Sequence, residues 1–255
     1  MLKVRIIPTL LWKNFGLVKG VCFNSWRRVG SVLPAVKVYN ARDVDELVLM
    51  DIAASDENSL IDQELVSDFS DECFVPLTVG GGISTVEDVR RLLYAGADKI
   101  LINSAAYKDP NLLEQIALQF GSQCVVAGID AKLVDQNKYI SYSHAGKINT
   151  KKDPVSWAKL VADKGAGEII ITSVDRDGTM QGYDLKLIES IVNAVNIPVI
   201  ASGGAGIYKH MCDAVLKVGA SAVAAASMFH FTEQTPTGAK VALAAAGISV
   251  RKNFN

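Results

Sequence analysis

The sequence predicts an α/β protein, a (β/α)8 barrel of the TIM type built from two (β/α)4 half-barrel repeats. Its 255 residues match the length of one such barrel, and 49% of them are hydrophobic but only 7% aromatic. Short apolar runs alternate with helical segments along the chain. Motifs of the first half recur in the second half in the same order. We expect a single domain over residues 1–255, because no Pro/Ser-rich linker or change in composition divides the chain.

Eight strands are expected from short apolar runs without polar alternation, which are typical of parallel strands buried on both faces. The clearest is the run Cys124–Ile129, which ends abruptly at Asp130 near the middle of the chain. The other expected strands, in chain order, are Val4–Leu11, Glu46–Ile52, Val75–Val79, Lys99–Asn103, Glu168–Ser173, Val199–Ser202 and Ala220–Ala226.

The helices are expected between these strands, where capping residues precede periodic segments. Ser84 or Thr85 caps one helix, and Asp109 with Pro110 at the first helical position begins another. The segment 13–20, which contains glycines, and the polar segment Ala53–Asn58 are expected as loops. The remaining expected helices are Leu33–Arg42, Ile61–Ser70, Pro154–Asp163, Leu185–Val195, Tyr208–Val218 and Ala239–Ala246.

The internal repeat favours a closed barrel over a doubly wound open sheet, which is the alternative topology. The segment 45–51 resembles the segment 167–173, and residue numbers 46 and 168 differ by 122. The glycine turns are expected to align Gly80 with Gly203, a difference of 123. Aligning the first and fifth strands places Lys13 on Lys132, a difference of 119. Chance similarity between βα units is the alternative explanation.

The composition excludes several classes of protein. A net charge of −1 gives no electrostatic case for nucleic acid or an acidic membrane surface. The four cysteines form no C-x-x-C pair, which is typical of reduced thiols in a cytoplasmic protein. No secretory signal or membrane span of about 20 apolar residues is visible. His144, expected in a hairpin loop, His210 and His230 are too scattered for a metal site, so we expect no metal and no cofactor.

Two glycine-rich turns are candidate phosphate sites. Gly80-Gly81-Gly82 follows the third strand, and Gly203-Gly204-Ala205-Gly206 follows the seventh. Glycines allow backbone N–H groups to face an anion, and Asn103-Ser104 and Ala226-Ser227 add donors after the fourth and eighth strands. The pattern predicts a ligand with a phosphate at each end. The alternative is that both segments are only tight turns.

Carboxylates at the ends of strands are candidate acids and bases. Asp130 and Asp177 follow neighbouring strands, where barrel enzymes place their chemistry. Asp51 and Asp175 lie at similar positions. The repeat aligns Asp130 with Leu11, which has no proton chemistry. For each aspartate, the alternative role is a helix cap or a salt bridge.

Charged residues also lie at the beginnings of four strands. If Arg5, Glu46, Lys99 and Glu168 point inward, they form a ring of two cations and two anions at the bottom of the lumen. Barrels usually fill that layer with aliphatic side chains. The alternative is exposed strand ends paired with helices.

Together these residues resemble the HisF family, the cyclase subunit of imidazole glycerol phosphate synthase, over nearly the whole chain. The motifs that carry the resemblance are Arg5-Ile-Ile-Pro8, Leu17-Val-Lys-Gly20, Asp45-Glu-Leu, Thr78-Val-Gly-Gly-Gly-Ile83, Ala97-Asp-Lys99, Ile102-Asn103, Phe120-Gly-Ser-Gln123, Ile129-Asp-Ala-Lys132, Gly165-Ala-Gly-Glu168, Thr172-Ser-Val-Asp-Arg-Asp-Gly-Thr179, Gly182-Tyr-Asp184, Ile200-Ala-Ser-Gly-Gly-Ala-Gly206 and Ala226-Ser227.

The resemblance implies a complex with a HisH-like glutaminase subunit on the N-terminal face of the barrel. Ammonia would enter past the charged ring and cross the lumen past Thr78 and Ser202. It would meet a bisphosphorylated small molecule at the C-terminal face. There the resemblance assigns one catalytic aspartate to Asp130 and the other to the position of Leu11. The implied phosphate-binding residues are Gly81, Gly82, Asn103, Ser104, Asp177, Gly178, Gly203, Gly204, Ala226 and Ser227.

Leu11 departs from the pattern of the cyclase, and we expect this departure to cripple cyclase activity. We expect a paralogous HisF-like subunit that supplies ammonia to a separate amidating enzyme acting on a surface-polysaccharide sugar. A genuine cyclase of histidine biosynthesis and a non-catalytic activator of the glutaminase are the alternatives. The sugar isomerase of the same pathway shares the repeat, but Leu11 and the charged ring count against it.

Overall fold

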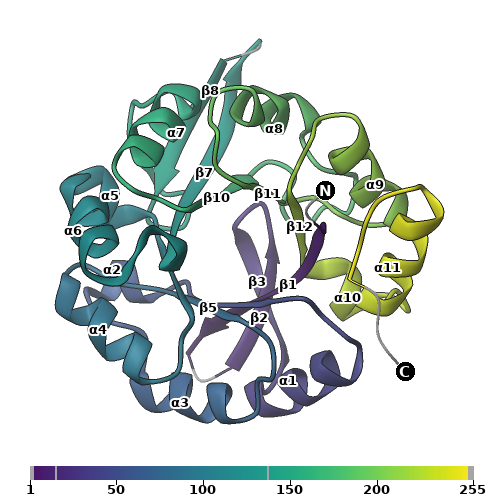
Figure 1. Cartoon of the computed structure of the whole chain (residues 1–255), viewed down its shortest axis with the longest axis horizontal. Helices are drawn as coiled ribbons and strands as arrows, with labels where there is room; N and C mark the ends of the chain where they lie inside the picture. The colour runs from purple at the N-terminus through teal and green to yellow at the C-terminus, as the bar shows by residue number, and fades with distance from the viewer. Residues whose placement is uncertain (1–2, 15, 137, 252–255) are drawn as a thin grey trace.

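The computed structural model describes residues 3–14, 16–136 and 138–251, and among these residues eight parallel strands close into a barrel (Figure 1). Pairing of β7 with β10, and of β12 with β1, completes the circle, which excludes the open sheet. The predicted (β/α)8 fold is confirmed. Around the barrel the strands are β1 (Arg5–Lys13), β4 (Leu47–Asp51), β5 (Leu77–Gly80), β6 (Lys99–Ile102), β7 (Val125–Asp135), β10 (Glu168–Ser173), β11 (Val199–Ser202) and β12 (Ala222–Ala225).

The aliphatic strands separate two hydrophobic layers, because alternate side chains of a strand point to opposite faces. One layer fills the lumen, and the other lies between the strands and the outer helices. This explains why the strands read as continuous apolar runs. The buried lumen residues are Ile7, Val48, Leu101, Val126, Ile170, Ile200, Ala222 and Ala224.

A ring of helices covers the outside of the barrel (Figure 1). Prediction was correct to the residue for α7, where Asp153 accepts from the Ser156 amide and Pro154 occupies the first turn. The cap of α6 was wrong by one residue, since Pro110 stands at the N-cap, although Asp109 accepts from the Asn111 amide. The main helices are α1 (Val32–Ala41), α3 (Gln63–Asp71), α4 (Val86–Tyr94), α6 (Asn111–Phe120), α7 (Pro154–Asp163), α8 (Leu185–Val192), α9 (Tyr208–Leu216) and α11 (Pro236–Ala245).

Short helical turns were missed. The expected loop Ala53–Asn58 contains α2 (Ala54–Glu57), which ends where Asn58 adopts a left-handed conformation. Helices of one turn have too few residues for a periodic signal. The others are α5 (Ser104–Lys108), α10 (Ser227–Phe231) and the 3-10 turn η1 (Ser122–Cys124).

Two antiparallel extensions rise from the C-terminal face. The expected loop after β1 is wrong: β2 (Gly16–Val21) and β3 (Asn24–Gly30) continue β1 as a meander. In the second half, β8 (Lys138–Ser143) and β9 (Ile148–Asn149) continue β7 in the same way. His144 lies in the turn between β8 and β9, as predicted.

The strand registers confirm the half-barrel repeat. Leu11 pairs with Met50, and Asp130 pairs with Thr172, so Leu11 and Asp130 occupy equivalent positions. The registers Leu47 with Leu77 and Ile169 with Val199 agree in the same way. The alignment of Gly80 with Gly203 was wrong by one residue, because these registers align residues 81 and 203, a difference of 122. Among the described residues, no helix has the length and apolar character to cross a membrane.

Candidate functional site

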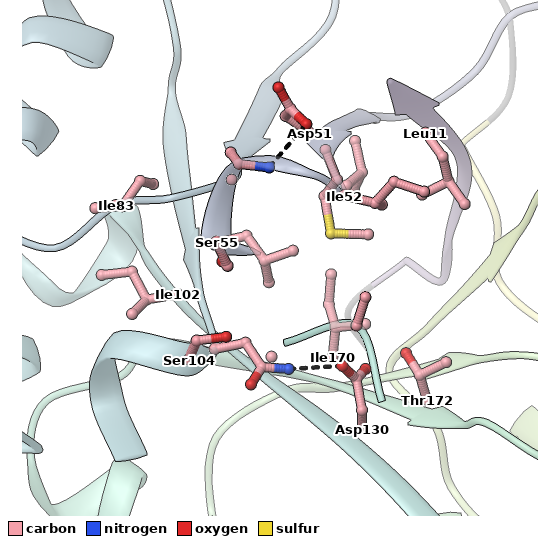
Figure 2. Close-up of a pocket in the computed structure, with 18 of the residues that line it drawn as sticks. Leu11, Asp51, Ile52, Ser55, Ile83, Ile102, Ser104, Asp130, Ile170 and Thr172 are labelled. Carbon is pink, nitrogen blue, oxygen red and sulfur yellow. Dashed lines mark hydrogen bonds between the residues drawn. The ribbon is translucent and has the colours of Figure 1, made fainter. Parts of the chain in front are cut away.

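A cavity of about 920 Å³ opens among the C-terminal ends of the strands (Figure 2). Asp130 and Leu11 both line it, together with the aspartate at the end of β4, Asp51. The structure thus brings both predicted glycine turns and the predicted acid into one site. Every predicted phosphate-binding residue lines this cavity: Gly81, Gly82, Asn103, Ser104, Asp177, Gly178, Gly203, Gly204, Ala226 and Ser227.

The two glycine turns have equivalent geometry in the two halves. Gly81 has a φ of 130°, and a Cβ there would lie 2.7 Å from the carbonyl oxygen of Asp51. Gly203 has a φ of 84°, and a Cβ there would lie 2.7 Å from the carbonyl oxygen of Ser173. At each position the positive φ and the short distance to a backbone oxygen exclude a residue with a side chain. Glycine therefore lets each turn pack closely against the end of the neighbouring strand, at a place where both turns line the cavity.

Two buried polar atoms at the cavity have no protein partner among the described residues. They are Oδ1 of Asn103 and Oγ of Ser227. Buried polar atoms are normally hydrogen-bonded, so both atoms fit contact with a polar ligand or water. Ser104 is already engaged, because its Oγ accepts from the His144 amide at 3.0 Å.

Asp130 is the candidate proton carrier. Its Oδ2 accepts from Nδ2 of Asn103 at 2.7 Å, as Figure 2 shows. Burial, followed by the charge of Asp177, raises the pKa of Asp130 to about 7, against the opposing effects of Asn103 and Lys132. A carboxyl group with this pKa can both release and accept a proton near neutrality.

Asp177 is engaged by a lysine that sequence reasoning did not assign to the site. Nζ of Lys19, on β2, lies 2.6 Å from Oδ2 of Asp177, and the Lys19 side chain is only 3% exposed. The Cys22 amide also donates to the carbonyl oxygen of Asp177 at 2.8 Å. The β2–β3 hairpin is therefore fastened to the loop after β10. The motif Leu17-Val-Lys-Gly20 was the available signal for Lys19.

Several apolar side chains line the cavity on the side of Leu11. Figure 2 shows Leu11 across the pocket from Asp130, and Met50, Phe23 and Trp26 also line the cavity. No proton donor stands at the position of Leu11. The site thus places Asp130 on one side and Leu11, which cannot exchange protons, at the mirror position.

The other strand-end aspartates have local structural roles. Asp51 accepts from the amides of Ala53 and Ala54 at 2.9 and 3.2 Å, which begins α2. Asp175 accepts from the Leu133 amide at 2.8 Å and so braces β7. Asp51 therefore has the alternative role expected for these aspartates, support of a helix N-terminus, although it also lines the cavity. Among the described residues, no group of three or more His, Cys, Asp or Glu side chains is arranged to hold a metal.

The charged ring forms at the opposite end of the barrel. Arg5 lies 2.6 Å from Glu46 and 2.7 Å from Glu168, and Lys99 lies 3.0 Å from each glutamate. The alternative of strand ends paired with helices is wrong for these residues, because they pair with one another. Oγ1 of Thr78 donates to Glu46 at 2.7 Å, which places Thr78 at the level of the ring.

Ser202 does not lie with the ring. It lines the mouth cavity, and the aliphatic lumen layer separates it from the charged residues. Val48, Leu101 and Ile170 belong to both the lumen layer and the cavity lining, so they form the floor of the cavity. The structure therefore has a polar lower end, an apolar middle and a polar mouth.

A comparison with protein-family models identifies this arrangement. The model described as "Histidine biosynthesis protein" matches residues 5–235. The chain belongs to this family. The family includes both the HisF-type cyclase and the sugar isomerase, and the match covers the whole barrel. In this member, Leu11 lies at the strand position that mirrors Asp130.

Proposed function

We propose that this chain is the synthase subunit of a glutamine amidotransferase complex and takes ammonia from a HisH-like glutaminase through its barrel. The ring of Arg5, Glu46, Lys99 and Glu168 carries the proposal. It is a paired set of charges at the strand beginnings, where barrels usually place aliphatic residues. In this proposal the charged entrance admits ammonia, and the aliphatic layer above it restricts water.

The exposed hydrophobic residues support docking of the glutaminase on the N-terminal face. Phe74, Tyr94 and Leu118 are each more than 80% exposed. Phe74 precedes β5, while Tyr94 and Leu118 lie at or near the C-terminal ends of α4 and α6. Helix ends before parallel strands lie on the same side of a barrel as the strand beginnings. Exposed aromatic and aliphatic side chains of this kind are typical of a protein interface.

At the mouth, we propose that a bisphosphorylated small molecule or free phosphate binds the two glycine turns. Leu11 supports the further proposal that acid–base cyclisation is not the task of this subunit. Ammonia would instead pass to a separate amidating enzyme that modifies a surface-polysaccharide sugar. Transfer of this kind needs a conduit and a partner, but it does not need the second aspartate.

The direct experiment is an assay of the purified chain with ammonium and the ribonucleotide substrate of the cyclase. We expect no more than trace formation of imidazole glycerol phosphate. In parallel, the chain is mixed with a HisH-type glutaminase from the same genome, and binding and glutamine hydrolysis are measured. Rapid imidazole glycerol phosphate formation would reject the amidation proposal. Absence of any complex would reject the amidotransferase proposal as a whole.

One observation favours a genuine cyclase as the second candidate. Asp130 has a pKa of about 7 and lies in the same cavity as both glycine turns. A single well-placed acid could sustain a slow cyclisation. Growth of a strain that lacks the cyclase, when supplied with this chain, would favour histidine biosynthesis over amidation.

The third candidate is a subunit that only activates its glutaminase. Thr78 distinguishes this role from conduction, because its hydroxyl is fully buried beside Glu46. A bulky substitution such as Thr78→Phe should reduce ammonia-dependent amidation in the assembled complex if ammonia crosses the lumen. Unchanged amidation, with full glutaminase stimulation, would favour the activator.

A further inference from the structure

Helices α4 and α9 occupy mirror positions in the two halves, but different side chains cap them. In the first half, Oδ2 of Asp88 accepts from the amides of Ser84 and Thr85 at 3.0 and 2.9 Å. In the second half, Nδ1 of His210 accepts from the amides of Gly206 and Ile207 at 3.1 and 3.4 Å. Residue numbers 88 and 210 differ by 122, the same difference as the strands around them. A histidine thus replaces the aspartate at one of two equivalent caps.

The beginning of α9 lacks the second side-chain acceptor that α4 has. In α4, the Thr85 hydroxyl also accepts from the Asp88 amide at 3.1 Å, so the two side chains support each other. The equivalent residue of α9 is Ile207, whose side chain has no acceptor. Among the described residues, His210 is therefore the side-chain acceptor that orders the beginning of α9.

His210 holds the turn that borders the mouth cavity. Gly203–Gly206 is buried, and the carbonyl oxygen of Gly204 accepts from the Gly182 amide at 2.7 Å. A Cβ at Gly182 would meet the His210 ring at 3.5 Å, so the segment that bonds Gly204 also lies beside this ring. Gln234 donates to the carbonyl oxygen of Gly206 from α11's N-terminal segment. His210 therefore holds Gly206, two residues from Gly204, which lines the cavity.

We propose that His210 is a positioning residue for the Gly203–Gly204 anion turn, and that acid weakens this turn while leaving its mirror, Gly81–Gly82, intact. This proposal rests on the proposed anion binding at the mouth. Only neutral imidazole has an acceptor nitrogen, and imidazolium carries N–H on both nitrogens. Protonated His210 would therefore direct a donor at two donors. Asp88 remains an acceptor at the same pH.

The charges around His210 agree with this assignment. Burial lowers the pKa of His210 from its ordinary value of 6.5; Asp213 opposes this effect and Lys209 adds to it. Both charged residues lie on α9, whereas the facing segments contribute the Gly182 and Gly206 backbone and the uncharged Gln234. The backbone amide contacts lower the pKa of Asp88, even though burial acts in the opposite direction. The amide contacts thus keep Asp88 charged to a lower pH than an ordinary aspartate.

The test uses inorganic sulfate, whose charge does not change between about pH 5 and about pH 8. Sulfate binding is followed at the amides of each glycine turn by NMR. We expect wild-type affinity at Gly203–Gly204 to fall about fivefold on acidification, the effect of losing a hydrogen bond. His210→Asn retains an acceptor that does not titrate, so it should restore acid binding. Asp88→His should transfer the sensitivity to Gly81–Gly82.

Equal loss at both turns in wild type, or acid loss that persists in His210→Asn, would overturn the proposal. A second readout is the hydrogen-exchange protection of the Gly206 and Ile207 amides, which should fall in acid in wild type but not in His210→Asn. If sulfate perturbs neither turn at any pH, the proposed anion function fails. In that case the hydrogen-exchange protection of the Gly206 and Ile207 amides tests the positioning role of His210 separately. Protection that does not change in acid would reject that role.

Discussion

The two halves of the barrel have the same backbone registers but supply different chemistry to its two ends. At the mouth, the second half contributes Asp130 and Asp177, whereas the first half places Leu11 at the position equivalent to Asp130. The glycine turns are preserved in both halves, with positive φ at Gly81 and Gly203. The mouth therefore has the same glycine turns in both halves, but it has a carboxyl group at only one of the two positions occupied by Leu11 and Asp130.

At the end of the barrel where the strands begin, the first half supplies more of the charged groups than the second. Glu46 and Glu168 are mirror residues, but both cations of the ring come from the first half. The residue equivalent to Lys99 in the second half is Ala222, which carries no charge. Thr78 pairs with Lys99, and its equivalent Ile200 pairs with Ala222. Each half alone would leave an incomplete site. The ring depends on closure of the barrel, since Arg5 and Lys99 each contact glutamates of both halves.

The largest expected effect comes from making the mouth symmetric. Leu11→Asp would place a carboxyl group opposite Asp130, in a buried position where its pKa would be raised. We expect cyclase activity with ammonium and the ribonucleotide substrate to rise at least about 100-fold over wild type. Formation of imidazole glycerol phosphate is the measurement.

Leu11→Asn is the matched control, because it has nearly the same shape as the aspartate but cannot exchange protons. If the two variants have the same activity, the missing carboxylate does not explain the difference between the halves. Sulfate titration of both variants would verify that the glycine turns still bind an anion. A folded, anion-binding Leu11→Asp variant without activity would count against the inferred role of this position.

Breaking the ring should have the next largest effect. Arg5→Met leaves Glu46, which is 2% exposed, and Glu168 with Lys99 alone. Removing one partner of a buried ion pair costs about 3–5 kcal/mol, and the retained Lys99 places the expected loss near the lower value. Urea unfolding near neutral pH measures the change.

Arg5→Met combined with Glu46→Gln is the control, because it removes one anion along with the cation. We expect this double variant to recover part of the lost stability. A single variant as stable as wild type would show that the ring contributes nothing net to folding. That outcome would leave a role in ammonia entry as its remaining explanation.

Much of the barrel follows from local sequence. The strands β10 and β11 and the helix α7 were predicted to the residue, because their apolar runs and caps are unambiguous. The meander β2–β3 was missed because its turn uses left-handed residues that are not glycine, Cys22 and Phe23, while the glycines lie inside the strands. In this segment the glycines, which usually mark loops, lie in the strand, and residues that usually favour strands form the turn.

Site residues that directly follow a strand could be predicted from the sequence. Site residues that depend on contacts between distant parts of the chain were missed. The glycine turns and Asp130 follow directly from strand ends. Lys19 did not, because its ion pair with Asp177 joins residues 158 positions apart. The cap by His210 also needed a three-dimensional comparison of the halves, since the residue that mirrors it is an aspartate.

A smaller effect is expected from Asp130→Asn, which tests the remaining acid of the mouth. Burial raises the pKa of Asp130 from 3.8 to about 7, so the folded protein binds a proton that the unfolded chain has lost between these values. Stability should therefore fall as pH rises from about 4 to about 7. The variant should lack this decrease, as measured by urea unfolding across that range.

The same variant tests whether Asp130 takes part in ammonia delivery. We expect amidation by the assembled complex to remain largely intact, because transfer of ammonia needs no acid at the mouth. Loss of amidation with an unchanged fold would assign chemistry or regulation to Asp130. An unaltered pH dependence of stability would contradict the raised pKa instead.

The smallest expected effect concerns the unequal helix caps. Ile207→Thr would give α9 the hydroxyl that α4 has in Thr85, and would place it near the His210 amide. A side-chain cap is worth about 0.5–2 kcal/mol, and this exposed site should yield a gain near the lower value. Thr85→Ile, the reverse change in the first half, should lose a similar amount. If Thr85→Ile is neutral while Ile207→Thr stabilises, then Asp88 alone suffices as a cap and a histidine in its place does not.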